Sequence, residues 1–120
     1  MKAWIAGVAL IASTWPVRAI EGRYSVEGQN PGGAQVYRGE AIIKKSGDTY
    51  SVVWQIGSGR QIGTGVLTGS VLSVVFQTVG ANGSGVASFE VVEGRVGVGR
   101  WAVIGARTTG SERWTPAPNP

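Results

Sequence analysis

Seven carboxylates are the side chains of this chain best suited to catalysis, but the groups that usually work with them are missing. They are Glu21, Glu27, Glu40, Asp48, Glu90, Glu93 and Glu112, and the chain has neither histidine nor cysteine. The lack of histidine removes the commonest general base and metal ligand, and the lack of cysteine excludes disulfide bonds. A carboxylate pair could hydrolyse a glycoside only at a particular separation, which the sequence does not define. We interpret Asp48, Glu90 and Glu93, which lie in or beside turns, as solvated surface residues.

Two other patterns look like reactive sites but lack the neighbours that the chemistry needs. Serine–lysine catalysis requires a desolvated lysine, whereas Lys44 and Lys45 lie next to a Gly-Asp turn. Phosphate-binding glycine loops lead into a helix, and no helical pattern follows the glycine pairs at residues 57–59 and 63–65. We therefore expect no enzyme activity, no cofactor and no metal site.

Aromatic side chains give the better indication of a binding site. Eight of them follow residue 19, namely Tyr24, Tyr37, Tyr50, Trp54, Phe76, Phe89, Trp101 and Trp114. In a wide barrel such rings line a cavity for an apolar ligand, and in a narrow barrel the same rings form the core. The sequence leaves both possibilities open. Our candidate ligand-binding residues are Asn30, Tyr37, Trp54, Phe89 and Trp101.

Alternating patterns predict that these rings lie on β-strands. Residues 50–56 and 72–76 alternate large apolar side chains with smaller or polar ones, the period of two that places one set on one face of a sheet. Extending the pattern between the glycines predicts about eight strands. Their expected ranges are 22–28, 36–46, 49–57, 60–68, 70–78, 84–92, 94–104 and 109–115.

The connections between these strands predict an antiparallel meander. Most are short and carry Gly, Asp or Ser, which suit tight hairpins. A meander of eight strands has two open edges unless it closes. We therefore predict an all-β fold, a single small antiparallel up-and-down β-barrel, with a β-sandwich as the alternative. The two longer connections, at 29–34 and 79–84, follow strands one and five and should therefore share one end of the barrel.

The first 19 residues have the profile of a secretory signal peptide. Lys2 precedes an uncharged apolar stretch at 3–12, and the run Val17-Arg18-Ala19 suits signal peptidase. An apolar run of about ten residues is too short for a bilayer, which needs about 20. We expect a signal peptide at 1–19, a β-barrel domain at 20–115 and a disordered, proline-rich tail at 116–120. The expected location is periplasmic or secreted, with no stable transmembrane segment after cleavage.

Charge argues against a nucleic-acid partner. The net charge is +4, and loss of Lys2 and Arg18 with the signal peptide would lower it to +2. The remaining basic residues are scattered along the chain, whereas a phosphate-binding surface usually gathers them on one stripe.

Three sequence segments resemble a known group of proteins. The run Gly22-Arg23-Tyr24-Ser25-Val26-Glu27-Gly28-Gln29-Asn30-Pro31-Gly32-Gly33, the run Tyr37-Arg38-Gly39 and the closing run Gly110-Ser111-Glu112-Arg113-Trp114-Thr115-Pro116 resemble small exported bacterial proteins commonly labelled hypothetical or fibronectin-binding. At the level of the fold, Gly99-Arg100-Trp101 is similar to the Gly-x-Trp of lipocalin barrels, although it lies near the end of the chain. The short meander is similar in plan to avidin. The first resemblance implies an extracellular protein partner.

These observations predict an exported, non-catalytic binding module. Its partner would be a small apolar molecule inside the barrel or a macromolecule, such as an extracellular protein, at the loop end. The alternative is a structural or envelope-associated protein that only self-associates.

The export hypothesis predicts a particular mature N-terminus. Cleavage after Ala19 should leave Ile20 as the first residue of the periplasmic or secreted protein. Intact-mass and N-terminal peptide analysis of the exported fraction would measure this. A form that starts at Met1, or a protein confined to the cytosol, would contradict the hypothesis.

Overall fold

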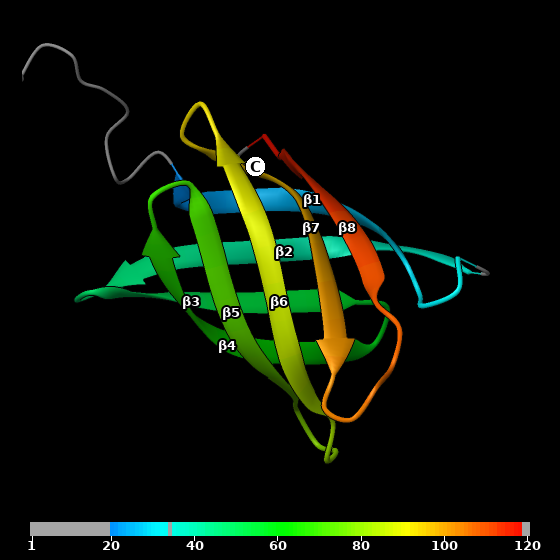
Figure 1. Cartoon of the computed structure of the whole chain (residues 1–120). Helices are drawn as coiled ribbons and strands as arrows, with labels where there is room; N and C mark the ends of the chain where they lie inside the picture. Colours follow the sequence, from blue (N-terminus) through cyan, green and yellow to red (C-terminus); the bar gives the residue numbers. More distant parts are fainter. Residues whose placement is uncertain (1–19, 34, 119–120) are drawn as a thin grey trace, which may run out of the picture.

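Eight β-strands pair in chain order and close into a barrel (Figure 1). The computed structural model describes residues 20–33 and 35–118, so the expected signal peptide lies outside the described residues. The strands are β1 (Gly22–Gln29), β2 (Val36–Ser46), β3 (Thr49–Ile56), β4 (Gly59–Thr68), β5 (Val71–Thr78), β6 (Ser84–Val92), β7 (Arg95–Val103) and β8 (Gly110–Pro116). Within the described residues, no helix is long and apolar enough to cross a membrane.

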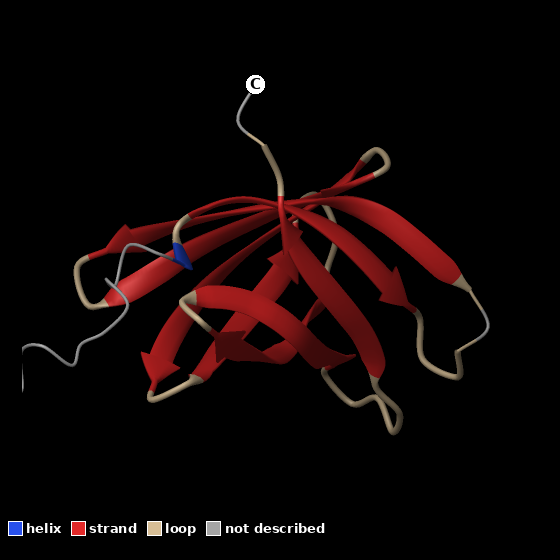
Figure 2. Ribbon diagram, turned by 90° about the horizontal axis from the view of Figure 1, so that it is seen from above, coloured by secondary structure: helices blue, strands red, loops and turns tan. Residues whose placement is uncertain are grey.

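The barrel closes because β1 pairs with both β2 and β8. Val26 lies opposite Gly39 on β2 and opposite Trp114 on β8. Every strand therefore has two hydrogen-bonded neighbours, and no sheet edge is left open. The predicted up-and-down barrel of eight strands is confirmed over the β-sandwich alternative, and in Figure 2 almost all of the described chain is strand.

Side chains alternate between the interior and the outer surface as the sequence predicts. On β3, Tyr50, Val52 and Trp54 are buried, whereas Ser51 and Gln55 are exposed. The buried side chains of all strands meet in one core. The outer surface carries the polar and small side chains of each strand, together with several exposed valines.

The C-terminal strand ends one residue later than expected, at Pro116. We expected a disordered tail from residue 116, but Pro116 belongs to β8 and lies opposite Tyr24, and the backbone N–H of Ala117 donates to the carbonyl of Arg23 at 2.9 Å. The pairing of β8 with β7 ends at Arg113. Pro116 therefore has no strand on that side to which a backbone N–H would have to donate, so the missing proline N–H costs no ladder hydrogen bond. Residues 119 and 120 lie outside the described part of the chain.

The two ends of the barrel differ. The hairpins after β2, β4 and β6 lie at the upper left of Figure 1, and the connections after β1, β3, β5 and β7 lie at the lower right. At the first end the hydroxyl of Tyr24 donates to the carbonyl of Ile20 at 2.9 Å and accepts from the N–H of Val96 at 3.3 Å. All three residues are at most 2% exposed, so they close this end, which leaves the other end for a site.

Glycines make room for the aromatic rings inside the barrel. At four glycines an added Cβ atom would overlap the aromatic ring directly across the strand pair, in the pairs Gly28–Tyr37, Phe76–Gly85, Phe89–Gly99 and Trp101–Gly110. A Cβ atom at Gly99 would overlap the Phe89 ring and lie 2.5 Å from the carbonyl oxygen of Ser88. The neighbouring ring therefore fills the space that a side chain on the glycine would occupy.

This packing predicts that alanine substitution destabilises the protein at one glycine of β7 and has little effect at another. Gly99→Ala should lower the free energy of unfolding by about 2–3 kcal/mol, because the new methyl group must displace Phe89 or the backbone. Gly97→Ala is the matched control, since a Cβ there would lie no closer than 3.6 Å to its nearest neighbour, the carbonyl of Glu90. Its effect should stay within about 0.5 kcal/mol. Urea denaturation measures both, and equal losses would mean that the rings do not need the glycines.

Candidate functional site

A cavity of about 350 Å³ opens at the loop end of the barrel. Its size is at the lower end of the range of about 300–1,000 Å³ found for ligand sites. Because antiparallel strands alternate in direction, the ends of β1, β3, β5 and β7 meet the starts of β2, β4, β6 and β8 here, as expected from the order of the strands. The lining residues are Asn30, Tyr37, Trp54, Ile56, Gly59, Arg60, Gln61, Phe76, Thr78, Ala87, Trp101, Val103 and Glu112.

Aromatic rings from four strands form the walls of the cavity. The ring centroids lie 5.9 Å apart for Trp54 and Phe76, and 6.5 Å apart for both Phe76–Trp101 and Tyr37–Trp101. All three pairs are edge-to-face, an arrangement that favours aromatic contact. The walls are therefore rigid, apolar and held by one another rather than by a loop.

Polar lining residues come from the ends of strands. Asn30 follows β1, Arg60 and Gln61 begin β4, and Thr78 ends β5. Arg60 is exposed, and the other three are half-buried. The cavity thus has a polar mouth, and the aromatic walls lie deeper in the barrel.

Glu112 is the one buried charged or polar residue among the described residues, with 7% of its surface exposed. Its carboxylate accepts three hydrogen bonds, from the Tyr37 hydroxyl at 2.6 Å, from Trp54 Nε1 at 3.2 Å and from Trp114 Nε1 at 2.9 Å. Each donor is a neutral aromatic side chain. Because an unpaired buried carboxylate would be costly, these bonds are what permits Glu112 to lie inside.

The position of Glu112 follows from the alternation of β8. Gly110, Glu112 and Trp114 are buried, and Ser111 and Arg113 between them are exposed. The two ion pairs of the described residues, Arg23–Glu40 and Arg38–Glu27, do not include Glu112. The carboxylate therefore fixes the orientation of two rings of the cavity wall, Tyr37 and Trp54, and of Trp114 in the packed core.

Burial raises the pKa of Tyr37 far above its ordinary value. The hydrogen bond to Glu112 and the negative charge of that carboxylate raise it further, because both disfavour a second anion nearby. The N–H of Trp101 opposes the rise, although this buried nitrogen falls short of hydrogen-bond geometry with any partner. Tyr37 consequently stays protonated and keeps donating to Glu112 throughout the neutral range.

The structure brings four of the five candidate residues together. Asn30, Tyr37, Trp54 and Trp101 all line the cavity. Phe89 does not; it is 1% exposed, and its ring centroid lies 4.7 Å from that of Trp114 in the packed core. The aromatic residues thus divide between cavity wall and core, the two possibilities that the sequence left open.

Sequence reasoning missed Glu112, Phe76 and Ile56 as parts of the site. The period of two on residues 110–114 could have placed Glu112 inside with Trp114, since the two lie two residues apart. No local pattern tells which inward-facing rings reach a cavity, because that depends on the height of each residue along the barrel.

The fold and the cavity together define the class of this protein as a small up-and-down β-barrel with an aromatic cavity open at one end. No family model matches the chain, and no curated protein matches it significantly. Among the described residues, no group of three or more His, Cys, Asp or Glu side chains could hold a metal ion.

The raised tyrosine pKa values predict a loss of stability at alkaline pH. Burial raises the pKa of Tyr24, Tyr37 and Tyr50, so above about pH 10 the unfolded chain loses protons that the folded protein keeps. The free energy of unfolding should therefore be unaffected by these groups at neutral pH and fall as the pH rises past 10. Urea melts between about pH 7 and pH 11 measure this.

Tyr37→Phe separates the contribution of Tyr37 to the pH dependence of stability from the contributions of Tyr24 and Tyr50. The variant should be less stable than the wild type at neutral pH by about 1–3 kcal/mol, because Glu112 loses one donor. Its stability should fall less steeply above about pH 10 than that of the wild type. Parallel curves for the two proteins would show that Tyr37 titrates as it does in the unfolded chain.

Proposed function

We propose that this protein is an exported, non-catalytic binding module that holds a small, mostly apolar molecule in the cavity at the loop end. The observation that carries the proposal is the cavity itself. It has a volume of about 350 Å³ and aromatic walls from four strands. Apolar concave sites with a few polar groups are the usual form of small-molecule sites.

The distribution of polar residues supports an orientation for the ligand. An apolar body would lie against Trp54, Phe76 and Trp101, where burial of its surface favours binding by about 25 cal/mol per Å². A polar end would face the mouth, where the side chains of Arg60 and Gln61 can donate hydrogen bonds. A molecule of about the size of a bicyclic aromatic compound suits the volume.

Glu112 supports a binding role rather than a catalytic one. It is the only acidic residue that lines the cavity, and general acid–base chemistry on most substrates needs a second group with a complementary role. Its two oxygens already accept three hydrogen bonds from the protein. Its role is to hold the walls in place.

A macromolecule at the loop end is the competing proposal, because the same four connections surround the mouth. The labels of the bacterial proteins that the sequence resembles imply such a partner. Native mass spectrometry of protein purified from its own host distinguishes the two. A bound small molecule supports the cavity, and an empty barrel that binds a matrix protein supports the loop surface.

A filled-cavity variant tests the proposal with a defined probe. We expect 2-naphthol to bind the wild type in isothermal titration calorimetry. Ile56→Trp replaces an aliphatic side chain at the mouth with a larger indole ring. It should weaken binding by about tenfold or more, equivalent to about 1.4 kcal/mol. Ser51→Trp is the matched control, because Ser51 is exposed on the outer face of the same strand. Equal weakening in both variants, or no binding to the wild type, would contradict the proposal.

A further inference from the structure

The outer surface of the barrel has two unlike halves. On β1, β2 and β8 the outward side chains include Arg23, Glu27, Arg38, Glu40 and Arg113. Two ion pairs join them across β1 and β2, Arg23–Glu40 at 2.9 Å and Arg38–Glu27 at 2.8 Å. This half is an ordinary hydrated protein surface.

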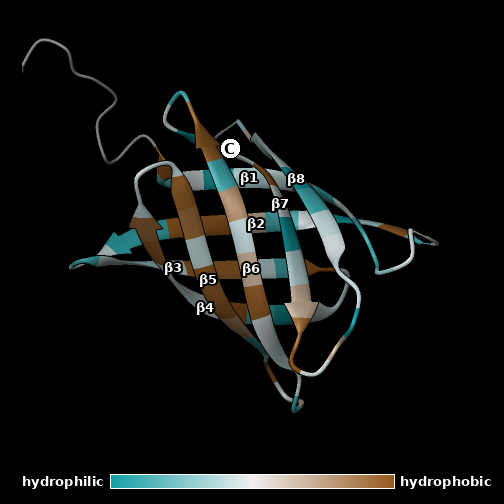
Figure 3. Cartoon of the chain, viewed as in Figure 1, coloured by the Kyte–Doolittle hydropathy of each residue, from teal (hydrophilic) through white to brown (hydrophobic). Residues whose placement is uncertain are grey.

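The other half lies on β4 to β7, where the exposed charged side chains are Arg60, Glu90, Arg95 and Arg100. Two rows of residues cross these strands, Thr64–Val75–Val86–Ala102 and Val66–Ser73–Ser88–Arg100. We call these rows, together with Ile62 and Val71, the valine face. In Figure 3, most of β5 is coloured as hydrophobic or neutral, whereas β8 carries hydrophilic segments.

The apolar side chains of the valine face are exposed to an unusual degree. Val75 is 56% exposed, Val86 is 54% exposed and Val66 is 50% exposed. Val75 lies directly opposite Val86, so the apolar area is continuous and not a set of single residues. Contiguous apolar patches of this kind on a protein surface mark interaction sites.

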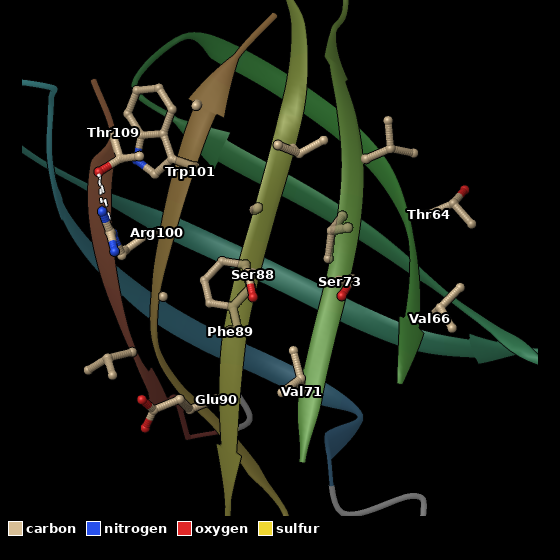
Figure 4. Close-up of a pocket in the computed structure, with 17 residues that line it drawn as sticks. Thr64, Val66, Val71, Ser73, Ser88, Phe89, Glu90, Arg100, Trp101 and Thr109 are labelled. Carbon is tan, nitrogen blue, oxygen red and sulfur yellow. Dashed lines mark hydrogen bonds between the residues drawn. The ribbon is translucent and has the colours of Figure 1, made fainter. Parts of the chain in front are cut away.

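The shape of the valine face leaves it open to a partner. A hollow of about 1060 Å³ lies over these strands (Figure 4). Arg100, the charged residue of the two rows, is turned toward β8, where its guanidinium donates to Thr109 Oγ1 at 3.2 and 3.4 Å. Its charge therefore lies beside β8. Glu90, which lies opposite Val71, also lines the hollow, and the other side chains of the two rows are valines, an alanine and small hydroxyl side chains.

We propose that the valine face is a dimerisation surface and that its partner is a second copy of this chain. The valines at the centre of this face require a partner surface that is also apolar, because any charge brought against them would lose its hydration without compensation. A second copy supplies such a surface by symmetry, since the same patch meets itself in a two-fold dimer. The charged half of the barrel could not replace it.

The size of the valine face fits a reversible dimer. Four strands about 4.8 Å apart and about seven residues long, at about 3.3 Å per residue, give a plan area on the order of 450 Å². Two such faces give a buried area on the order of 900 Å² in total, at the low end of the range for protein interfaces, where association is weak and reversible. The dimer should therefore dissociate in the micromolar range.

Sedimentation velocity of the intact exported protein tests the proposal. Between about 1 µM and about 500 µM the wild type should change from monomer to dimer. Val75→Lys should remain monomeric over the whole range, because two ammonium groups would be buried face to face in the dimer. Val92→Lys is the matched control and should dimerise as the wild type does, since Val92 is also 56% exposed but lies at the hairpin between β6 and β7.

Three results would overturn the proposal. They are a wild type that stays monomeric at the highest concentration, a Val75→Lys protein that still dimerises, and a monomeric wild type that instead floats with vesicles of phosphatidylcholine and phosphatidylglycerol. Circular dichroism melts check that the lysine variants are folded, and Val86→Lys repeats the test at a second position. The outcome is independent of the cavity, because Val75 and Val86 point away from it.

Discussion

The narrow interior of an eight-stranded barrel is the constraint on which the rest of this structure depends. Such a barrel is just wide enough for its own side chains to fill, and here eight aromatic residues follow the expected cleavage point. The rings fit because glycines lie across from them, as with Phe89 over Gly99 and Trp101 over Gly110. Glycine inside a strand normally weakens it. In this barrel the loss is offset by the aromatic surface that each missing side chain allows to be buried.

Glu112 turns this packed interior into two regions with different properties. Toward the closed end, Trp114 packs against Tyr24 and Phe89, and the core is dense. Toward the loop end, Tyr37 and Trp54 donate hydrogen bonds to Glu112, which hold these rings in the wall of the cavity. A single buried carboxylate with neutral donors thus separates the part of the barrel that stabilises the fold from the part that is free to bind.

The side chains of β5 to β7 alternate between two faces. Some of the inward side chains line the cavity, and several outward side chains belong to the valine face. Phe76 and Trp101 point inward to the cavity, while Val75 and Val86, which occupy neighbouring positions on these strands, point outward. An outer partner would cover one side of the barrel without blocking the loop end. Ligand binding in the cavity and association through the valine face are therefore compatible in one molecule.

The sequence by itself determined the strands, their order and their inward faces, because alternation and turn residues are local properties that act over a few residues. The alternating pattern and the hairpin turns predicted both ends of all eight strands to within one residue. Closure into a barrel followed from the need to satisfy two open edges. Only the tertiary structure decided which rings line a cavity, why Glu112 can lie inside, and that the exposed valines of four strands form one face. These properties depend on register around the closed barrel, which brings together residues far apart in the sequence, such as Tyr37 and Glu112, 75 positions apart.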